Sequence, residues 1–317
     1  MLYRLLKIPA KIAIYFYCRS IRINSIEYLK SEGPLLIAAN HPNSFLDAVI
    51  IATLFKRPVY SLTRGDVYST PLKSKILHAL KMFPVFRMSE GVENMDQNYE
   101  TFEKCKEVFK NNGIVLIFSE GLCINEWHLR PLKKGTARLA ISSWEENIPL
   151  KILPTSINYS VFKSFGKNVI LSFGDPMYEE DIDHTNGYGK TISDFNEKLA
   201  KRLQPLTVEL TKEDKEARKS IFYRHQSFIK RILLAIPALI GYVLHAPLYI
   251  IVKNFTERKA GQSGHFDSIM VAILFVAYPF FLLLSALLIW VIGGPWWLVF
   301  LILPFCAWSY VQLKRQI

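Results

Sequence analysis

Several patterns on which common functional sites depend are missing from this sequence. The four cysteines stand far apart and form no Cys-x-x-Cys pair, which argues against a disulfide framework or a thiolate metal site and fits a reducing compartment. No Gly-x-Ser-x-Gly elbow supplies a nucleophilic serine, and no cluster of metal ligands is visible. The formal charge of +12 favours an anionic partner, but no zinc finger, RNA-recognition signature or basic heptad array is present. We therefore expect lipids or phosphorylated substrates as partners, no nucleic acid, and no metal or other cofactor.

Charge is also missing from three long apolar runs near the C-terminus, residues 232–252, 269–292 and 296–313. The second run is long enough to span a bilayer core, and the third is just long enough. Lys253, Arg258 and Lys259 follow the first run, and a crossing there would put them opposite the larger N-terminal part, against the positive-inside tendency. We expect a membrane region over 232–317, in which the first run is interfacial or re-entrant and the other two form a transmembrane hairpin. A buried helical subdomain is the alternative.

Two basic segments flank the part of the chain between residues 25 and 205. Residues 1–24 predict an interfacial amphipathic helix, whose cations on one arc are Arg4, Lys7, Lys11, Arg19 and Arg22. A helix packed on the domain's own core is the alternative. Residues 206–231 predict a basic helical connector, and its position just before the apolar runs suits an acidic lipid surface.

Residues 25–205 alternate between strand-like and helix-like pieces. The predicted strands are 34–39, 58–62, 83–87, 114–118, 150–158 and 168–173, and the predicted helices are 47–56, 72–81, 95–111, 132–145 and 191–204. Such alternation predicts an α/β domain with a mixed or largely parallel sheet covered by helices. In sheets of this kind the functional site gathers at the ends of the strands.

A histidine and a carboxylate follow the first predicted strand, in Asn40-His41-Pro42-Asn43-Ser44-Phe45-Leu46-Asp47. Imidazole titrates near neutral pH and can take a proton from an attacking alcohol, and a carboxylate on its other nitrogen fixes its tautomer. This pair is the base and orienter of a Ser-His-Asp triad without the serine, so the nucleophile would be a hydroxyl of the substrate. The alternative is an ordinary loop histidine, with Asp47 as the N-cap of a helix.

Further charged residues stand at the ends of later strands. They are Arg87 at the end of Met82-Phe83-Pro84-Val85-Phe86-Arg87, Glu120 and Gly121 after the run 114–118, and Arg130 and Lys133 in the turn before the helix near 135. A planar guanidinium suits a phosphate, and cations beside the free N–H groups of a helix start form a natural phosphate site. Surface ion pairs and solvated charges are the alternative.

Taken together and in this order, these blocks resemble the glycerolipid, or PlsC-like, acyltransferase family over residues 25–205. The resemblance implies that His41 is the base and Asp47 its orienter, that Arg87 contacts the acceptor phosphate, and that Glu120, Gly121 and Lys133 take part in acceptor binding. It links the fourth block, Leu153 to Tyr159, to the acyl donor.

The sequence departs from the family pattern at two places. Five residues rather than four separate His41 from Asp47, so the pair requires a local adjustment of the turn. Ser119 replaces the usual proline, and Leu122-Cys123 replaces a common Thr-Arg, which passes the phosphate contact to Arg130 or Lys133.

The resemblance implies an O-acyltransferase of phospholipid biosynthesis, bound to the membrane with its catalytic domain on the cytoplasmic face. It would move a fatty acyl group from acyl-CoA or acyl-carrier protein to a hydroxyl of glycerol 3-phosphate or lysophosphatidic acid. Two alternatives stay open: an acyltransferase or transacylase for a non-phosphate lysolipid such as an amino-acid lipid, and a non-catalytic lipid-binding protein tethered to the membrane.

Overall fold

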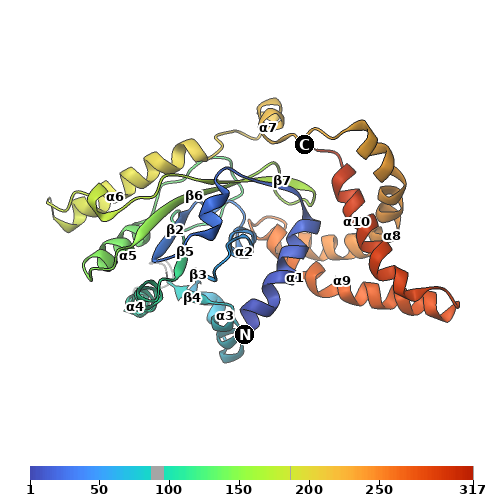
Figure 1. Cartoon of the computed structure of the whole chain (residues 1–317), viewed down its shortest axis with the longest axis horizontal. Helices are drawn as coiled ribbons and strands as arrows, with labels where there is room; N and C mark the ends of the chain where they lie inside the picture. The colour runs from blue at the N-terminus through green and yellow to red at the C-terminus, as the bar shows by residue number, and fades with distance from the viewer. Residues whose placement is uncertain (87–95, 186, 317) are drawn as a thin grey trace.

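A seven-stranded mixed sheet lies at the centre of the computed structural model, which describes residues 1–86, 96–185 and 187–316 (Figure 1). In this part of the chain the strands are β1 (Cys18–Ile23), β2 (Leu35–Ala39), β3 (Val59–Arg64), β4 (Met82–Val85), β5 (Ile114–Phe118), β6 (Lys151–Tyr159) and β7 (Lys167–Phe173). Their spatial order is β1-β7-β6-β2-β5-β3-β4. Strands β6, β2, β5, β3 and β4 run parallel, β7 is antiparallel to β6, and β1 pairs parallel with β7. The expected mixed, largely parallel sheet is confirmed.

Helices cover both faces of this sheet. They are α1 (Leu2–Tyr17), α2 (Phe45–Leu54), α3 (Pro71–Ala79), α4 (Asp96–Lys110), α5 (Lys134–Trp144), α6 (Tyr188–Leu203), α7 (Lys215–Phe222), α8 (Phe228–Ala260), α9 (Phe266–Val291) and α10 (Val299–Leu313). One core cluster joins the sheet to α4, α5 and α6, and the other joins it to α1, α2 and the parts of α8 and α9 nearest to it. The five expected helices between residues 47 and 204 therefore all form, with small shifts of their ends.

Strand β2 explains why the sheet needs cover on both faces. All five of its residues are buried, and a continuous apolar run is typical of a strand between two helical layers. Leu35, Ile37 and Ala39 belong to the core cluster with α1 and α2, whereas Leu36 and Ala38 belong to the cluster with α4 to α6. Because β2 is the central strand of the seven, its end after Ala39 lies at the middle of the sheet's edge.

The N-terminal segment differs from the expectation. The helix predicted over 1–24 ends at Tyr17, because Cys18–Ile23 form β1 at the edge of the sheet. Arg19 and Arg22 therefore do not share the arc of Lys7. Arg19 Nε donates to the carbonyl of Gln312 over 3.1 Å, and burial lowers the pKa of this arginine to about 10. The sheet domain begins near residue 18 rather than 25.

Within the described residues, three helices are long and apolar enough to cross a membrane, Phe228–Ala260, Phe266–Val291 and Trp296–Leu313. They lie on the side of the sheet away from α5 and α6 (Figure 1). Both ends of α8 touch the rest of the protein. Lys230 Nζ donates to Gln312 Oε1 over 3.1 Å, and Lys163 Nζ donates to the carbonyl of Gly261 over 2.7 Å. Helix α9 begins inside the sheet domain, since Phe266 and Asp267 are buried there.

Candidate active site

The turn after β2 holds His41 against the carboxyl edge of the sheet. Its imidazole is stacked on the ring of Phe118, the last residue of the neighbouring strand β5, with 3.8 Å between the ring centroids and 13° between the planes. The His41 side chain is 16% exposed. The ring is therefore fixed on one face and open to solvent at its edge.

Asp47, in the first turn of α2, is the partner of His41. Its Oδ2 lies 2.9 Å from His41 Nδ1 and also accepts the N–H of Asn43 over 2.8 Å, while Oδ1 accepts the hydroxyl of Tyr159 over 2.6 Å. Burial and the neighbouring Asp47 raise the pKa of Tyr159, so this hydroxyl stays protonated and donates. A carboxylate at Nδ1 favours the tautomer with its proton on Nδ1, in which Nε2 carries the lone pair. In the described part of the chain, Nε2 has no hydrogen-bond partner.

The extra residue between His41 and Asp47 is accommodated at Ser44. This residue has a φ of 54° and a ψ of −139° and stands just before α2. Such a conformation is uncommon for a residue other than glycine and costs on the order of 1–3 kcal/mol, so its surroundings must hold it. The local adjustment that the spacing required is therefore found in the structure.

Glu120 ties two segments of the site together. Its Oε2 accepts the backbone N–H of His41 over 2.8 Å, and its Oε1 accepts the backbone N–H of Arg130 over 2.9 Å. The side chain is 4% exposed, and burial raises the pKa of its carboxyl while the two N–H donors oppose that rise. The acid predicted as an acceptor ligand thus fixes the backbone of the base.

The predicted cations lie at the same edge of the sheet. Arg130 is half-buried, with Nη1 3.3 Å from Glu126 Oε2, and Lys133 is exposed at the N-cap of α5. The N–H of Lys133 donates to Ser119, directly after β5, over 2.7 Å. Arg87 lies outside the described residues.

Gly121 turns the chain after β5. Its φ is +68°, in the left-handed region that favours glycine, and an added Cβ would lie 2.8 Å from Cγ of Lys133. The structure gives this residue a conformational role, because it lets the stem of Lys133 lie close over the turn.

Several residues of the site were not predicted as such. Tyr159 was assigned only to the fourth block, yet its hydroxyl holds Asp47. Asn43, inside the motif, donates through its side chain to Asp267 of α9 over 2.8 Å. The signal for Tyr159 was its place at the end of a strand, and the signal for Asp267 was a lone acid at the start of an apolar run.

An apolar cavity of about 570 Å³ begins beside the loop between His41 and Asp47. Its wall includes Phe45 and Leu46 of that loop, and it continues between α1, α2, α3 and α9. Side chains such as Ala10, Val49 and Phe275 make the lining mostly apolar. Its size is in the range of sites that bury small ligands.

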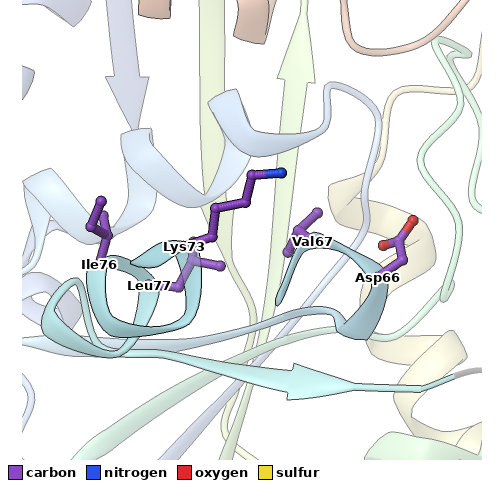
Figure 2. Close-up of a pocket in the computed structure, with 5 residues that line it drawn as sticks. All are labelled: Asp66, Val67, Lys73, Ile76 and Leu77. Carbon is purple, nitrogen blue, oxygen red and sulfur yellow. The ribbon is translucent and has the colours of Figure 1, made fainter. Parts of the chain in front are cut away.

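A second hollow, of about 500 Å³, lies between α3 and the short helix η2 (Gly65–Tyr68) (Figure 2). Figure 2 shows Lys73 and Leu77 on the side of α3 toward Val67 of η2, with Ile76 on the far side of α3 and Asp66 beyond Val67. Ile76 also lines the larger cavity, so the two hollows adjoin across α3. The second hollow shares no lining residue with the His41–Asp47 loop.

The thiol of Cys123 lies within range of the charge of Asp47 and interacts with Ser44. Burial, and then the charge of Asp47, raise its pKa to about 12, so at neutral pH it is a thiol rather than a nucleophilic thiolate. An imidazole whose Nδ1 lies on a buried carboxylate, as in His41 and Asp47, is an arrangement able to take a proton from a hydroxyl group.

The sequence model of the family described as Acyltransferase matches residues 20–158. The chain is similar to this acyltransferase family over those residues, and the resemblance to glycerolipid acyltransferases drawn from the sequence is confirmed. The matched residues contain His41, Asp47, Glu120, Arg130 and Lys133. They end one residue before Tyr159.

Two curated proteins and one solved structure are similar to the chain. The 1-acyl-sn-glycerol-3-phosphate acyltransferase BAT2 of Brassica napus is 25% identical over 191 residues, which are 56% of this chain and 50% of that protein. Glycerol-3-phosphate O-acyltransferase 2 of Saccharomyces cerevisiae is 26% identical over 141 residues, 44% of this chain and 18% of that protein. The crystal structure of PlsC, the 1-acyl-sn-glycerophosphate (LPA) acyltransferase of Thermotoga maritima, aligns with a TM-score of 0.47 at 16% identity, over 70% of this chain and 82% of that chain. The chain thus spans half or less of the curated relatives it matches.

Proposed function

We propose that this protein is a membrane-bound O-acyltransferase that moves a fatty acyl group from a coenzyme A or carrier-protein thioester to a hydroxyl of glycerol 3-phosphate or lysophosphatidic acid. The observation that carries the proposal is the hydrogen-bonded series Tyr159–Asp47–His41, which leaves Nε2 of the imidazole as a base at the sheet edge. The acceptor class comes from the names of the two curated relatives.

The proposed reaction needs a single proton carrier. Nε2 of His41 takes the proton of the acceptor hydroxyl while the hydroxyl oxygen attacks the thioester carbonyl carbon. The new C–O bond forms, the C–S bond breaks, and the imidazolium returns the proton to the leaving thiolate. Asp47 stabilises the imidazolium between these steps, and such base catalysis contributes about 10²- to 10⁴-fold.

The phosphate of the acceptor is proposed to bind where Arg130 and Lys133 precede α5. Both residues connect directly to the strand ends beside His41, Arg130 through Glu120 and Lys133 through Ser119. The first N–H groups of α5 and the adjacent cations favour an anion there. Arg87, outside the described residues, is the third proposed contact. Holding the acceptor in this way supplies the part of the rate that a base alone does not.

The acyl chain of the donor is proposed to enter the apolar cavity beside Phe45 and Leu46. Phe45 and Leu46, the neighbours of Asp47 in sequence, line this cavity together with residues of α9 such as Phe275, so an acyl group held there would extend toward the membrane helices. Polar substrate groups and the acyl chain would then approach His41 from different sides.

The proposed membrane arrangement puts the catalytic domain on the cytoplasmic face. Helices α9 and α10 form the transmembrane hairpin. Helix α8 enters the membrane without crossing it, so both of its ends stay on the side of the catalytic domain, in line with the contacts at those ends. The cations after α8 and after α10 then stay on one side, as the positive-inside tendency favours. The exposed apolar residues of α1, among them Leu5, Ile8 and Ile12, are proposed to rest in the same membrane surface.

The test measures acyl transfer by the full-length protein in lipid nanodiscs, with labelled acyl-CoA or acyl-carrier protein as donor. Acceptors with and without phosphate are compared, for example glycerol 3-phosphate, lysophosphatidic acid and an amino-acid lysolipid. We expect transfer to the phosphorylated acceptors and a loss of about 10²- to 10⁴-fold in His41→Ala. The matched control is His184→Ala, since this exposed histidine packs on Trp144 of α5.

Two results would contradict the proposal. A strong preference for acceptors without phosphate would remove the glycerol phosphate assignment. Undiminished transfer by His41→Ala would remove the base.

A further inference from the structure

The loop from His41 to Asp47 is held on one side by the sheet and on the other by the start of α9. On the sheet side, Glu120 and Tyr159 bind the backbone of His41 and the carboxylate of Asp47. On the other side, the loop meets residues 265–268, which lie far beyond the residues that match the acyltransferase family.

Each of three loop residues makes a polar contact with this segment. Asn43 Nδ2 donates to Asp267 Oδ2 over 2.8 Å. Ser44 Oγ lies 2.5 Å from His265 Nδ1. The N–H of Leu46 donates to Ser268 Oγ over 3.1 Å. The contacts therefore surround Ser44, the residue with the uncommon positive φ.

Asp267 is the centre of this contact region. Its side chain is 1% exposed, and it forms an ion pair with Lys167 of β7, which is 0% exposed. Besides Lys167 Nζ and Asn43, it accepts the hydroxyl of Tyr17 and the N–H of Lys163. A carboxylate with four donors from four parts of the chain has one position available to it.

The ion pair contributes more to geometry than to stability. Buried ion pairs often add no net stability over apolar side chains of the same volume, because both charges lose their water. A satisfied buried polar network does, however, fix one arrangement of the groups that it joins. Here the group at its edge is Asn43, whose own N–H donates to Asp47 Oδ2.

We propose that the start of α9 is a positioning element of the active site, in which Asp267, through Asn43, and Ser268, through Leu46, hold the His41–Asp47 loop in its catalytic shape. The proposal rests on the proposed function, since His41 is taken there as the base. It makes the membrane helix part of the catalytic apparatus rather than only an anchor. Neither residue touches substrate; both act on the loop that carries the base.

The first experiment measures backbone hydrogen exchange of residues 41–47 in the full-length protein in nanodiscs, which requires no substrate. Asp267→Asn and Ser268→Ala are expected to speed exchange of the Asn43 and Leu46 amides by at least about tenfold, because each amide depends on the loop conformation that is lost. The matched control is Thr256→Val in α8. It removes a buried hydroxyl that bonds only to Val252 within its own helix, and it should leave the loop amides as they are.

The second experiment measures kcat and KM for acyl transfer. We expect kcat to fall about 10- to 100-fold in Asp267→Asn with KM little changed, as for a small misplacement of catalytic groups. Asn43→Ala breaks the same link from the loop side. It should lower kcat by a similar factor, and the double variant should be no slower than the worse single variant.

Each result decides between the two proposals. Wild-type exchange rates and wild-type kcat in both Asp267→Asn and Ser268→Ala would overturn the positioning role while the transferase assignment stood. A wild-type protein that transfers no acyl group to any acceptor would overturn the proposed function, and the exchange rates would still test whether α9 holds the loop. Should Asp267→Asn fail to fold, Ser268→Ala provides both measurements, with an expected kcat loss of about 3- to 10-fold.

Discussion

Two buried carboxylates flank the same asparagine, and they differ above all in the nitrogen group that each one binds. Asp47 accepts a tyrosine hydroxyl and the backbone N–H of Asn43, and Asp267 accepts a tyrosine hydroxyl and the side-chain amide of Asn43. The nitrogen partner of Asp47 is the imidazole of His41, whose side chain is 16% exposed, whereas that of Asp267 is the ammonium of Lys167, whose side chain is fully buried.

This difference fits the proposed roles, in which Asp47 serves chemistry and Asp267 serves structure. An imidazole gains and loses a proton near neutral pH, so the charge beside Asp47 can change during a reaction. Lys167 is closed off from solvent with its carboxylate, and removing it leaves that carboxylate buried without its ion-pair partner. Substitutions on the Asp47 side should therefore act on rate, and those on the Asp267 side on stability and on the shape of the loop.

The largest expected effect is that of Asp47→Asn on the rate. An amide cannot hold the proton on Nδ1 as a carboxylate does, so the imidazole adopts the wrong tautomer and kcat falls by about 10²- to 10⁴-fold. Single-turnover acyl transfer in nanodiscs measures this loss, and thermal unfolding in detergent should move little by comparison. A variant that unfolds early but keeps its turnover would reverse the assignment of the two carboxylates.

The next effect is that of Lys167→Met on stability. Methionine approximates the lysine stem but leaves Asp267 buried without its cation, and breaking such a pair costs about 3–5 kcal/mol. Denaturant unfolding in detergent micelles should show this loss directly. An unfolding free energy within about 1 kcal/mol of the wild type would mean that the ion pair of Lys167 and Asp267 does not hold the structure together.

A matched pair of tyrosines sharpens the comparison further. Tyr159→Phe and Tyr17→Phe each delete one hydroxyl from a buried carboxylate, and each should cost about 1–3 kcal/mol of stability. Only Tyr159→Phe acts on the orienter of the base, so we expect it to lower kcat about tenfold more than Tyr17→Phe does. Equal kcat values in the two variants would remove Tyr159 from the catalytic arrangement.

The smallest expected effect is the contribution of Lys314, one of several cations near Asp267, to the pH dependence of stability. Burial, followed by Arg19 and Lys167, lowers the pKa of Lys314 from its ordinary 10.5 to about 8. Because the unfolded chain then binds the proton more tightly, stability should rise with pH between about 8 and 10.5. Lys314→Met should flatten that rise when unfolding is followed across this window, and an unchanged slope would assign the rise to another group.

The strands that are continuous apolar runs could be predicted from the sequence. Strands β2, β5 and β6 could be read from the sequence because both of their faces are buried, and the helices between them could be read from their spacing. Strand β1 could not, since its arginines continue the basic arc of the preceding helix. Its assignment depends on pairing with β7, a partner that lies far along the chain.

The sequence predicted the contact inside the motif, between His41 and Asp47, but not the contacts that the motif makes with distant parts of the chain. His41 and Asp47 are close in sequence, so one turn brings them together, and strand ends gather the later blocks at the same edge. The contact between Asn43 and Asp267 spans most of the chain, and no local pattern reports it. Lys167 directly precedes the predicted strand 168–173, and its burial and its pairing with Asp267 of α9 are seen only in the structure.

The entry of α9 into the sheet domain limits how the protein can be shortened for study. A version cut at residue 231 to gain solubility would lose Asp267 and Ser268 together with the apolar hairpin. Lys167 would be left without its counter-ion, and the buried Leu46, whose N–H donates to Ser268 of α9, would lose that cover. Detergent extraction of the whole chain, rather than truncation, is the route to a preparation that still resembles the native enzyme.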